Sequence, residues 1–409
     1  MSVQNTVFLM ENQIMHYSWG SRDFIARLCG EKVPSELPQA ELWLGAHTKA
    51  PSMIIEGQNE MPLDQYITHD PRNILGNGTA TEYGELPFLF KVLSAAQPLS
   101  VQVHPNKEQA RAGFKVEEEK LLPLDAAIRN YKDKNHKPEM LLALTPFEAL
   151  SGIRPFAEIV ELITLLRLDD KIEEFKELIT DISETKLRIF FKWILGLKRR
   201  TRDKVRGNII RAAMLRRGCD HPSALAIEWI CRLDHYYPED IGIFAPLVMN
   251  TIRLQPGEAI FMDAGILHAY LQGSGLEIMA NSDNVMRCAL TGKHIDVPEL
   301  MKIASFMPVY PHYIRPEMHG MEEVYKTPAP EFLLSRFNLS SSIRFNQLDS
   351  AQIILVTEGS LMITPEVGDA LSLEQGQSVF ISKTAISCQL TGKATFYRVQ
   401  AGEKIRTRI

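Results

Sequence analysis

Cysteines are few in this sequence, and none stands in a pairing pattern. The 409 residues include five, namely Cys29, Cys219, Cys231, Cys288 and Cys388. An odd number at irregular spacing, without Cys-x-x-Cys, excludes a disulfide framework, and a chain of this length can bury a large core without such staples. The N-terminal residues also lack the basic and apolar segments of a signal peptide. We therefore expect a reducing compartment, the cytoplasm.

Long apolar runs and an excess of basic charge are also missing. No stretch of about 18 apolar residues occurs, so the sequence predicts no membrane span. The formal net charge is −5, which argues against a nucleic-acid partner because no domain-wide basic excess is present. Neither a P-loop nor a G-x-G-x-x-G segment opening a helix occurs, so no nucleotide is expected. Nothing in the sequence demands a partner chain, and we expect a monomer.

The periodicity of apolar residues changes twice along the chain. Residues 1–154 contain short apolar runs between Gly, Pro and Asn, which is typical of strands in a sandwich or barrel. Residues 155–245 contain helix-length segments such as AEIVELITLLR, and strand-like runs return after them. The sequence thus predicts a mainly β fold with a helical insertion. Its expected domains are a first β-domain from 1–154 and 246–312, a helical domain at 155–245 and a second β-domain at 313–409.

A faint internal repeat links the two β-domains. LQPGEAIFMDAGILHAYL, from Leu254, matches LEQGQSVFISKTAISCQL, from Leu373, with turn glycines and apolar residues at corresponding positions. We interpret the pair as two copies of one β-unit. His268 in the first copy corresponds to Ser387 in the second, and no histidine occurs after His319. If the first copy holds a metal ion, the second has therefore lost it.

Three segments bring together residue types that bind divalent metal ions. Gln102 and His104 lie two residues apart on a predicted strand, so their side chains face the same way. Glu139 follows in NHKPE, and His268 lies in LHAY. Two imidazoles, a carboxylate and an amide oxygen suit zinc first and leave room for water or substrate. Each of these residues alone is more often a packed or surface side chain, so the prediction rests on their combination.

Other titratable residues surround these segments. Lys137 and His136 precede Glu139, and residues 267–296 mix charged groups with apolar residues that a solvated loop would rarely carry. The candidates in that stretch are Tyr270, Glu277, Asp283, Arg287 and Lys293. Charged groups in partly apolar surroundings indicate function, although structural ion pairs are the alternative and weigh equally for Asp283.

These residues stand in motifs of a known family. The motifs, in chain order, are YSWG, ELWLGAH, LPFLFKVLSAAQPLSVQVHPN, NHKPEM, ALSGIRPF and GEAIFMDAGILHAYLQGSGLEIMANSDNVMRCALTGKHIDV. Over nearly its full length the chain resembles the type I mannose-6-phosphate isomerase (phosphomannose isomerase) family. The resemblance implies two cupin-type jelly rolls and a helical domain, with the second jelly roll degenerate and free of metal.

The resemblance also implies site residues. It implies one Zn²⁺ per chain, held by Gln102, His104, Glu139 and His268. It assigns Arg287 to catalysis, Lys137 and Glu277 to the substrate pocket, Lys91 and Ser100 to the phosphate, and Trp19 and Tyr270 to the pocket wall. The chain departs from the family pattern at Gly292 and Thr48, where proline is expected. Gly292 is expected to loosen the loop that carries Lys293, another substrate-binding candidate.

The activity implied is interconversion of D-mannose 6-phosphate and D-fructose 6-phosphate, by proton transfer between C1 and C2 through a cis-enediol. Zinc would stabilise the charge that develops on oxygen, and Arg287 and Lys137 would add positive charge. Glu277 is the first candidate for the general base and His136 the second, and the sequence does not decide between them. The alternatives are a non-haem iron cupin oxygenase and a non-catalytic protein that binds sugar phosphates.

Overall fold

The computed structural model describes residues 5–402, and the strands of this range, β1 to β22, form two sheets of 11 strands each. The first sheet consists of β2 (Gln13–Met15), β3 (Glu41–Leu44), β6 (Phe88–Ala95), β7 (Val101–Val103), β8 (Glu139–Ala143), β9 (Phe147–Ile153), β10 (Met249–Leu254), β11 (Ala259–Met262), β12 (His268–Ala280), β13 (Met286–Ala289) and β14 (His312–Ile314). Its longest strand, β12, pairs with β7 and β9 at its start and with β6 and β8 further on. This strand therefore joins the two halves of the first jelly roll.

The second sheet combines the C-terminal strands with three from the N-terminal part of the chain. It consists of β1 (Val7–Glu11), β4 (Met53–Glu56), β5 (Asn59–Pro62), β15 (Glu317–His319), β16 (Glu322–Tyr325), β17 (Leu333–Leu339), β18 (Ser342–Phe345), β19 (Gln352–Pro365), β20 (Leu371–Glu374), β21 (Ser378–Ile381) and β22 (Cys388–Gln400). Strand β1 lies between β21 and β4. The sequence did not indicate this pairing, because an apolar run predicts a buried strand without identifying its neighbour.

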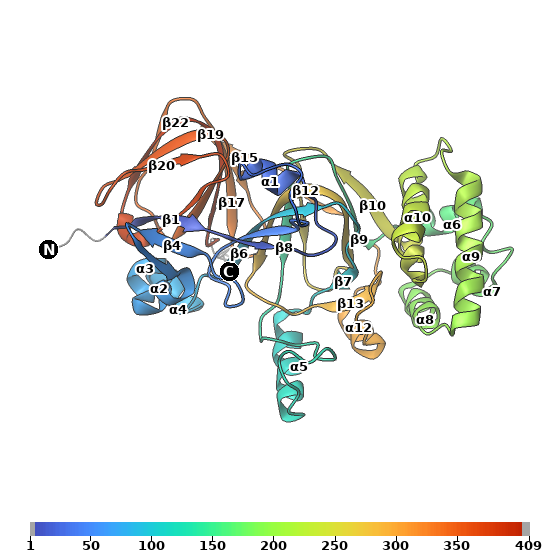
Figure 1. Ribbon diagram of the computed structural model, residues 1–409. Helices are drawn as coiled ribbons and strands as arrows, with labels where there is room; N and C mark the ends of the chain where they lie inside the picture. Colours follow the sequence, from blue (N-terminus) through green and yellow to red (C-terminus); the bar gives the residue numbers. More distant parts are fainter. Residues whose placement is uncertain (1–4, 403–409) are drawn as a thin grey trace.

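The predicted helical insertion corresponds to a group of helices at one end of the molecule, drawn in green in Figure 1. These are α6 (Phe156–Leu165), α7 (Glu173–Thr180), α8 (Glu184–Leu195), α9 (Arg199–Arg216) and α10 (Ala224–Tyr236), followed by the 3-10 helix η1 (Ile241–Phe244) and α11 (Ala245–Val248). Their apolar faces pack against β7, β9, β12 and β13 in one continuous core. The insertion is thereby attached to the strands that carry the predicted metal ligands.

Shorter helices lie in the connections between strands. They are α1 (Phe24–Leu28), α2 (Leu63–His69), α3 (Pro71–Leu75), α4 (Asn77–Glu82), α5 (Lys107–Glu119), α12 (Val297–Ile303) and the 3-10 helix η2 (Lys383–Ala385). Helix α5 extends away from the first jelly roll (Figure 1). It begins with a capping box, in which Asn106 and Gln109 exchange hydrogen bonds with each other's backbone N–H groups. No helix among the described residues is long and apolar enough to cross a membrane.

The two β-domains share a core between them and have separate interiors. Phe90 and Ile278 of the first sheet and Ile353 and Phe380 of the second belong to the shared core. The internal repeat is visible in the fold, since β11 and β21 begin 119 residues apart and have the same length. In the second jelly roll Ser387, which corresponds to His268 in the repeat, lies directly before β22, whereas His268 begins β12. The Ser387 hydroxyl donates to Glu366 and accepts from Arg344, at 2.7 and 3.0 Å.

Candidate metal centre and active site

The two histidines and the glutamate predicted as ligands meet inside the first jelly roll. His104 follows β7, Glu139 begins β8 and His268 begins β12. The three side chains are at most 1% exposed, and one potential ligand atom from each lies within 4.8 Å of the others. The Nε2 atoms of His104 and His268 lie 3.3 and 3.2 Å from the Glu139 carboxylate oxygens. Among the described residues this is the only such group of His, Cys, Asp or Glu side chains.

The hydrogen bonds behind the histidines orient them as metal ligands. His104 Nδ1 lies 2.6 Å from the carbonyl oxygen of Asn284, and His268 Nδ1 lies 2.9 Å from that of Ile266. A carbonyl only accepts, so each Nδ1 carries the proton and each Nε2 directs a lone pair at the cluster. Burial and the nearby Lys137 charge lower the pKa of His104 to about 4, so its imidazole is neutral at pH 7, as a ligand must be.

Several polar atoms of the cluster make no hydrogen bond of normal geometry with the described residues, although Lys137 and the imidazoles lie close to them. By hydrogen-bond geometry, His104 Nε2 and both Glu139 carboxylate oxygens have no partner among the described residues. Burial alone would raise the pKa of Glu139, but the Lys137 ammonium brings it well below its ordinary value. An ionised carboxylate and two imidazole lone pairs in a buried site fit a divalent cation.

Gln102 completes the predicted ligand set. It lies on β7 directly opposite His268 and Arg287 of the neighbouring strands. Its side-chain amide lies 3.3 Å from His268 Nε2. The amide oxygen and nitrogen are assigned from the hydrogen-bond network, and an amide turned by 180° would present its oxygen to the cluster.

A β-bulge brings Glu277 to the same interior. His268 and Tyr270 are an even number of residues apart, whereas Glu277 is an odd number away and would face outwards on a regular strand. The pairing of β12 with β9 shifts register between Tyr270 and Gln272, which reverses the alternation. Glu277 consequently lies opposite Leu141, which packs with Tyr270 in the barrel interior. Burial, and then the charges of Glu277 and Glu139, raise the pKa of Tyr270 well above its ordinary value.

Glu277 forms a buried ion pair with Lys91. Their Oε2 and Nζ atoms are 2.8 Å apart, and the lysine ammonium also lies 3.7 Å from Glu41 Oε2 and over the ring of Trp43. Burial alone would lower the pKa of Lys91, but the two carboxylates raise it, so the lysine is charged. Trp43 Nε1 donates to Glu41 at 2.6 Å. Two carboxylates thus compensate Lys91, which the sequence prediction had assigned to the phosphate.

Lys137 and His136, although adjacent, point to different places. Lys137 Nζ lies 2.5 Å from Glu139 Oε1 and the residue is 7% exposed. His136 instead pairs with Glu331, with 2.7 Å between Nε2 and Oε1, and does not join the metal cluster. Of the two candidate bases, only Glu277 lies in the barrel interior.

Three positively charged side chains, Arg287, Lys293 and Lys132, lie near one another beside the centre, and we call this group its rim. The guanidinium of half-buried Arg287 has no ion-pair partner within the described part of the chain. Burial lowers its pKa, and burial together with neighbouring positive charges also lowers those of Lys293 and Lys132. Asp283 pairs instead with Lys49 at 2.7 Å and approaches His47 at 3.6 Å. Asp283 also compensates Lys132 in part, but cations that still repel one another favour a bound anion.

The remaining predicted residues lie close to this interior. Trp19 packs against the same core cluster as Tyr270 and stacks on Tyr17, with 5.8 Å between ring centroids. Ser100 is half-buried immediately before β7.

Sequence analysis missed three residues of the site. Glu41 lies far in sequence from Lys91, and Lys132 far from Arg287, although each pair is close in space. Asn284 acts through its backbone carbonyl. The Asn284 side chain also accepts from the backbone N–H of Lys132 at 2.7 Å, so it joins that loop to His104. The one available signal was the position of Glu41 in the ELWLGAH motif.

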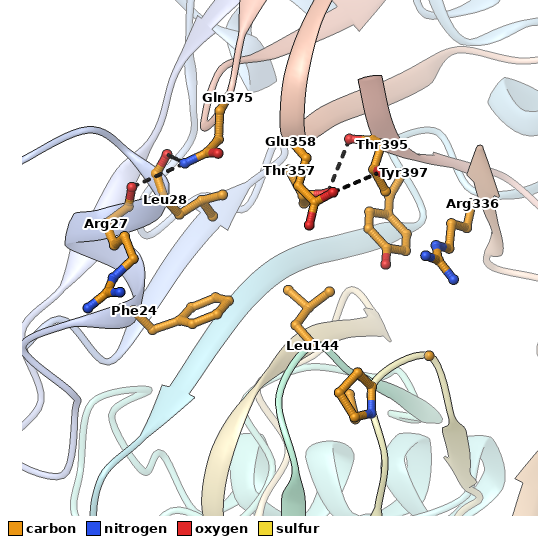
Figure 2. Close-up of a pocket in the computed structure, with 13 residues that line it drawn as sticks. Phe24, Arg27, Leu28, Leu144, Arg336, Thr357, Glu358, Gln375, Thr395 and Tyr397 are labelled. Carbon is orange, nitrogen blue, oxygen red and sulfur yellow. Dashed lines mark hydrogen bonds between the residues drawn. The ribbon is translucent and has the colours of Figure 1, made fainter. Parts of the chain in front are cut away.

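A cavity away from this centre lies between α1 and the two sheets, with a volume of about 320 Å³ (Figure 2). Its polar groups are largely engaged with one another. Gln375 donates to the backbone carbonyls of Arg27 and Leu28, at 3.2 and 3.4 Å, and Thr395 donates to Glu358 at 3.3 Å. These contacts join α1 to the second jelly roll, so we interpret the cavity as part of the domain seam.

Comparisons with known proteins identify close relatives. The family described as Phosphomannose isomerase type I, catalytic domain, matches residues 7–156, and that described as Mannose-6-phosphate isomerase, cupin domain, matches residues 322–401. Mannose-6-phosphate isomerase of Escherichia coli is 38% identical over 392 residues, which cover 95% of this chain and 98% of the relative. The human enzyme of that name is 34% identical over 420 residues, covering 94% and 96%.

Solved structures give the same result. A variant of phosphomannose isomerase from Salmonella typhimurium superposes with a TM-score of 0.91 at 36% identity, covering 98% of this chain and all of the other. A zinc-bound holo form of mannose 6-phosphate isomerase also superposes with a TM-score of 0.91, at the same identity and coverage. The cupin fold expected for the two β-domains is thereby confirmed.

Proposed function

The chain belongs to the type I phosphomannose isomerase family, and we propose that it interconverts D-mannose 6-phosphate and D-fructose 6-phosphate. The observation that carries this proposal is the buried His–Glu–His cluster next to a second buried carboxylate, Glu277, inside one jelly roll. Aldose–ketose isomerisation needs both parts, since a carbon-bound proton must move while negative charge develops on oxygen.

Zinc fits the donor set, and a zinc-bound relative has the same fold. We propose that His104, Glu139 and His268 hold one ion, with Gln102 as the fourth ligand. When bound there, zinc supplies a Lewis acid that stabilises negative charge on a substrate oxygen. The Asn284 and Ile266 carbonyls would keep the imidazoles in the ligating tautomer.

Glu277 is the proposed general base that moves the proton between C1 and C2. Its carboxylate is 3% exposed and lies 2.8 Å from the Lys91 ammonium. Lys91 would orient this carboxylate and compensate its charge until it takes up the proton. The pairing of His136 with Glu331 supports Glu277 over His136. Lys137 and Arg287 are the proposed sources of fixed positive charge for the enediol oxygens.

We propose that the phosphate binds at the rim, where Arg287, Lys293 and Lys132 repel one another and Asp283 compensates only Lys132 in part. Ser100 remains a candidate hydroxyl donor to it, whereas Lys91 is better placed to hold Glu277. Trp19 and Tyr270 would form the wall, and Asp283 would hold Lys49 at the entrance. We retain the cytoplasm as the proposed compartment, which the five unpaired cysteines support.

The test is turnover of mannose 6-phosphate by the purified protein, measured as fructose 6-phosphate before chelation, after chelation and after return of zinc. We expect activity to disappear with the chelator and to return with zinc. A folded, zinc-loaded sample that binds mannose 6-phosphate without turnover would favour the binding-protein alternative. Oxygen uptake with iron and none with zinc would favour the oxygenase.

A further inference from the structure

The helical insertion reaches the active-site rim through the turn between α10 and η1. We propose that Asp240, in this turn, is a positioning residue for the reaction, because its carboxylate holds the loop that carries Lys293 and follows Arg287. The inference rests on the proposed function, since Arg287 and Lys293 matter only if the rim binds the substrate phosphate.

Each carboxylate oxygen of Asp240 accepts one backbone N–H group. Oδ1 accepts from Gly242 at 2.7 Å and caps η1. Oδ2 accepts from Thr291 at 2.9 Å, in the loop after β13. The Thr291 hydroxyl in turn accepts from the backbone N–H of Lys293 at 3.1 Å. Hydrogen bonds to an ionised acceptor are the stronger kind, so this carboxylate is a firm link between insertion and loop.

Packing holds the start of the loop at Leu290, which is buried in the core, whereas Gly292 and Lys293 are exposed. Leu290 has φ of 57°, a left-handed backbone angle that non-glycine residues adopt only when their surroundings impose it. The pairing of β13 with β7 also shifts register between Arg287 and Ala289. On the insertion side, a cavity of about 540 Å³ is lined by Asp240, Thr291 and Gly292, among others. Side-chain packing therefore leaves a gap where the Asp240 hydrogen bond crosses to the loop.

The same turn makes two further contacts with the site. A Cβ added at Gly242 would lie 2.7 Å from Ala289 Cβ, so η1 sits directly against the end of β13. Tyr237 donates its hydroxyl to the carbonyl of Pro98 at 2.6 Å, just before Ser100 and β7. The insertion thus holds the segments that precede β7 and follow β13, the two strands that carry Gln102 and Arg287.

The test compares Asp240→Ser with Asp234→Ser. A serine hydroxyl can still cap η1 through Gly242 but is too short to reach Thr291. Asp234 lies in α10 and pairs with Arg206, so its replacement removes the same charge from the same region without touching the loop. Kinetics with mannose 6-phosphate, binding of inorganic phosphate by calorimetry, zinc content and the melting temperature Tm are measured for both variants.

For Asp240→Ser we expect kcat/KM to fall about tenfold, mainly through KM, as for the loss of one hydrogen bond to a charged group. Phosphate should bind about tenfold more weakly, with zinc content unchanged, and Asp234→Ser should behave as wild type. In a Lys293→Ala background, Asp240→Ser should have a smaller effect, because both changes act on one loop.

Wild-type kinetics and phosphate affinity in Asp240→Ser would overturn the inference, as would equal losses in both variants or an Asp240→Ser protein that does not fold. An inactive wild type would refute the proposed function instead, and the phosphate titration would still decide whether Asp240 positions the rim.

Discussion

Replacing Glu277 by Gln tests the centre of the proposed mechanism. The change removes the proposed base while retaining the shape of the side chain and an oxygen that can accept from Lys91. General bases contribute roughly 10²–10⁴-fold to rate, so we expect a loss of kcat in that range. The ligands His104, Glu139 and His268 are unchanged, so zinc content should stay at one ion per chain.

The effect on stability follows from the buried charges. Removing one partner of a buried ion pair destabilises a protein by about 3–5 kcal/mol when the other charge is left alone. Lys91 retains Glu41, whose carboxylate lies 3.7 Å away, so it is not left alone. We therefore expect a smaller loss of about 2 kcal/mol on the same scale. The variant should fold, with a Tm lowered by about 2 °C for a chain of this length.

The assay is incorporation of solvent deuterium at C2 of the sugar phosphate, which reports proton transfer directly. Glu41→Gln is the matched control, because it removes the other carboxylate next to Lys91 and leaves the base in place. We expect this control to lose less than about tenfold in rate, far less than a general base contributes. If Glu277→Gln keeps most of its exchange, or if both variants lose it equally, Glu277 is not the base.

Four further predictions follow from the geometry. His104→Ala should abolish stoichiometric zinc binding, measured by metal analysis after dialysis, because it removes one of three clustered ligands. Metal-free protein should lose stability as pH falls from 6.5 towards about 4, because the folded-state pKa of His104 lies below its unfolded value and the unfolded chain takes up the proton first. The measurement is Tm as a function of pH, which should vary less in His104→Gln. The same variation of Tm in both proteins would contradict this origin. Lys293→Ala and Lys132→Ala should each raise KM for mannose 6-phosphate about tenfold, as expected for the loss of one charged contact, while the zinc content stays unchanged. Steady-state kinetics in which only kcat changes would refute a role in phosphate binding. Gly242→Ala should lower the unfolding free energy by about 1–3 kcal/mol in urea denaturation, because its Cβ would overlap Ala289, whereas Gly207→Ala in α9, with no atom closer than 3.7 Å, should have no such effect.

Much of the fold could be predicted from local patterns. Short apolar runs identified strands, three- and four-residue spacing identified the helices between residues 156 and 245, and matched glycines revealed the repeated β-unit. The division into three domains stays a prediction. Strands β1, β4 and β5, which it places in the first β-domain, lie in the sheet of the C-terminal strands, because β1 pairs with β21. Such pairing depends on which sheet edge is free, and a strand's own sequence does not record that.

The candidate metal site could also be predicted from the sequence, because its proposed ligands are residue types that bind metal ions and two of them are spaced as on one strand face. Gln102 and His104 share one face of a strand through simple alternation, and the motifs around Glu139 and His268 resemble those of one family. The ion pairing of Lys91 could not be predicted from the sequence in the same way. It depends on Glu41 and Glu277, which come from two other strands and convert a free lysine into a buried ion pair.

By itself, then, the sequence determined the secondary structure, the repeated β-unit and the donor set of the centre, since each is encoded by residues close together or by residue type. Tertiary structure alone decided which charges face one another. The bulge in β12 turns Glu277 towards the interior that contains Tyr270. The packing of the second β-domain brings Glu331 to His136. The helical insertion places Asp240 in hydrogen-bond contact with the loop that carries Lys293. Each of these contacts joins residues through strand register or domain packing, which are set by the chain as a whole.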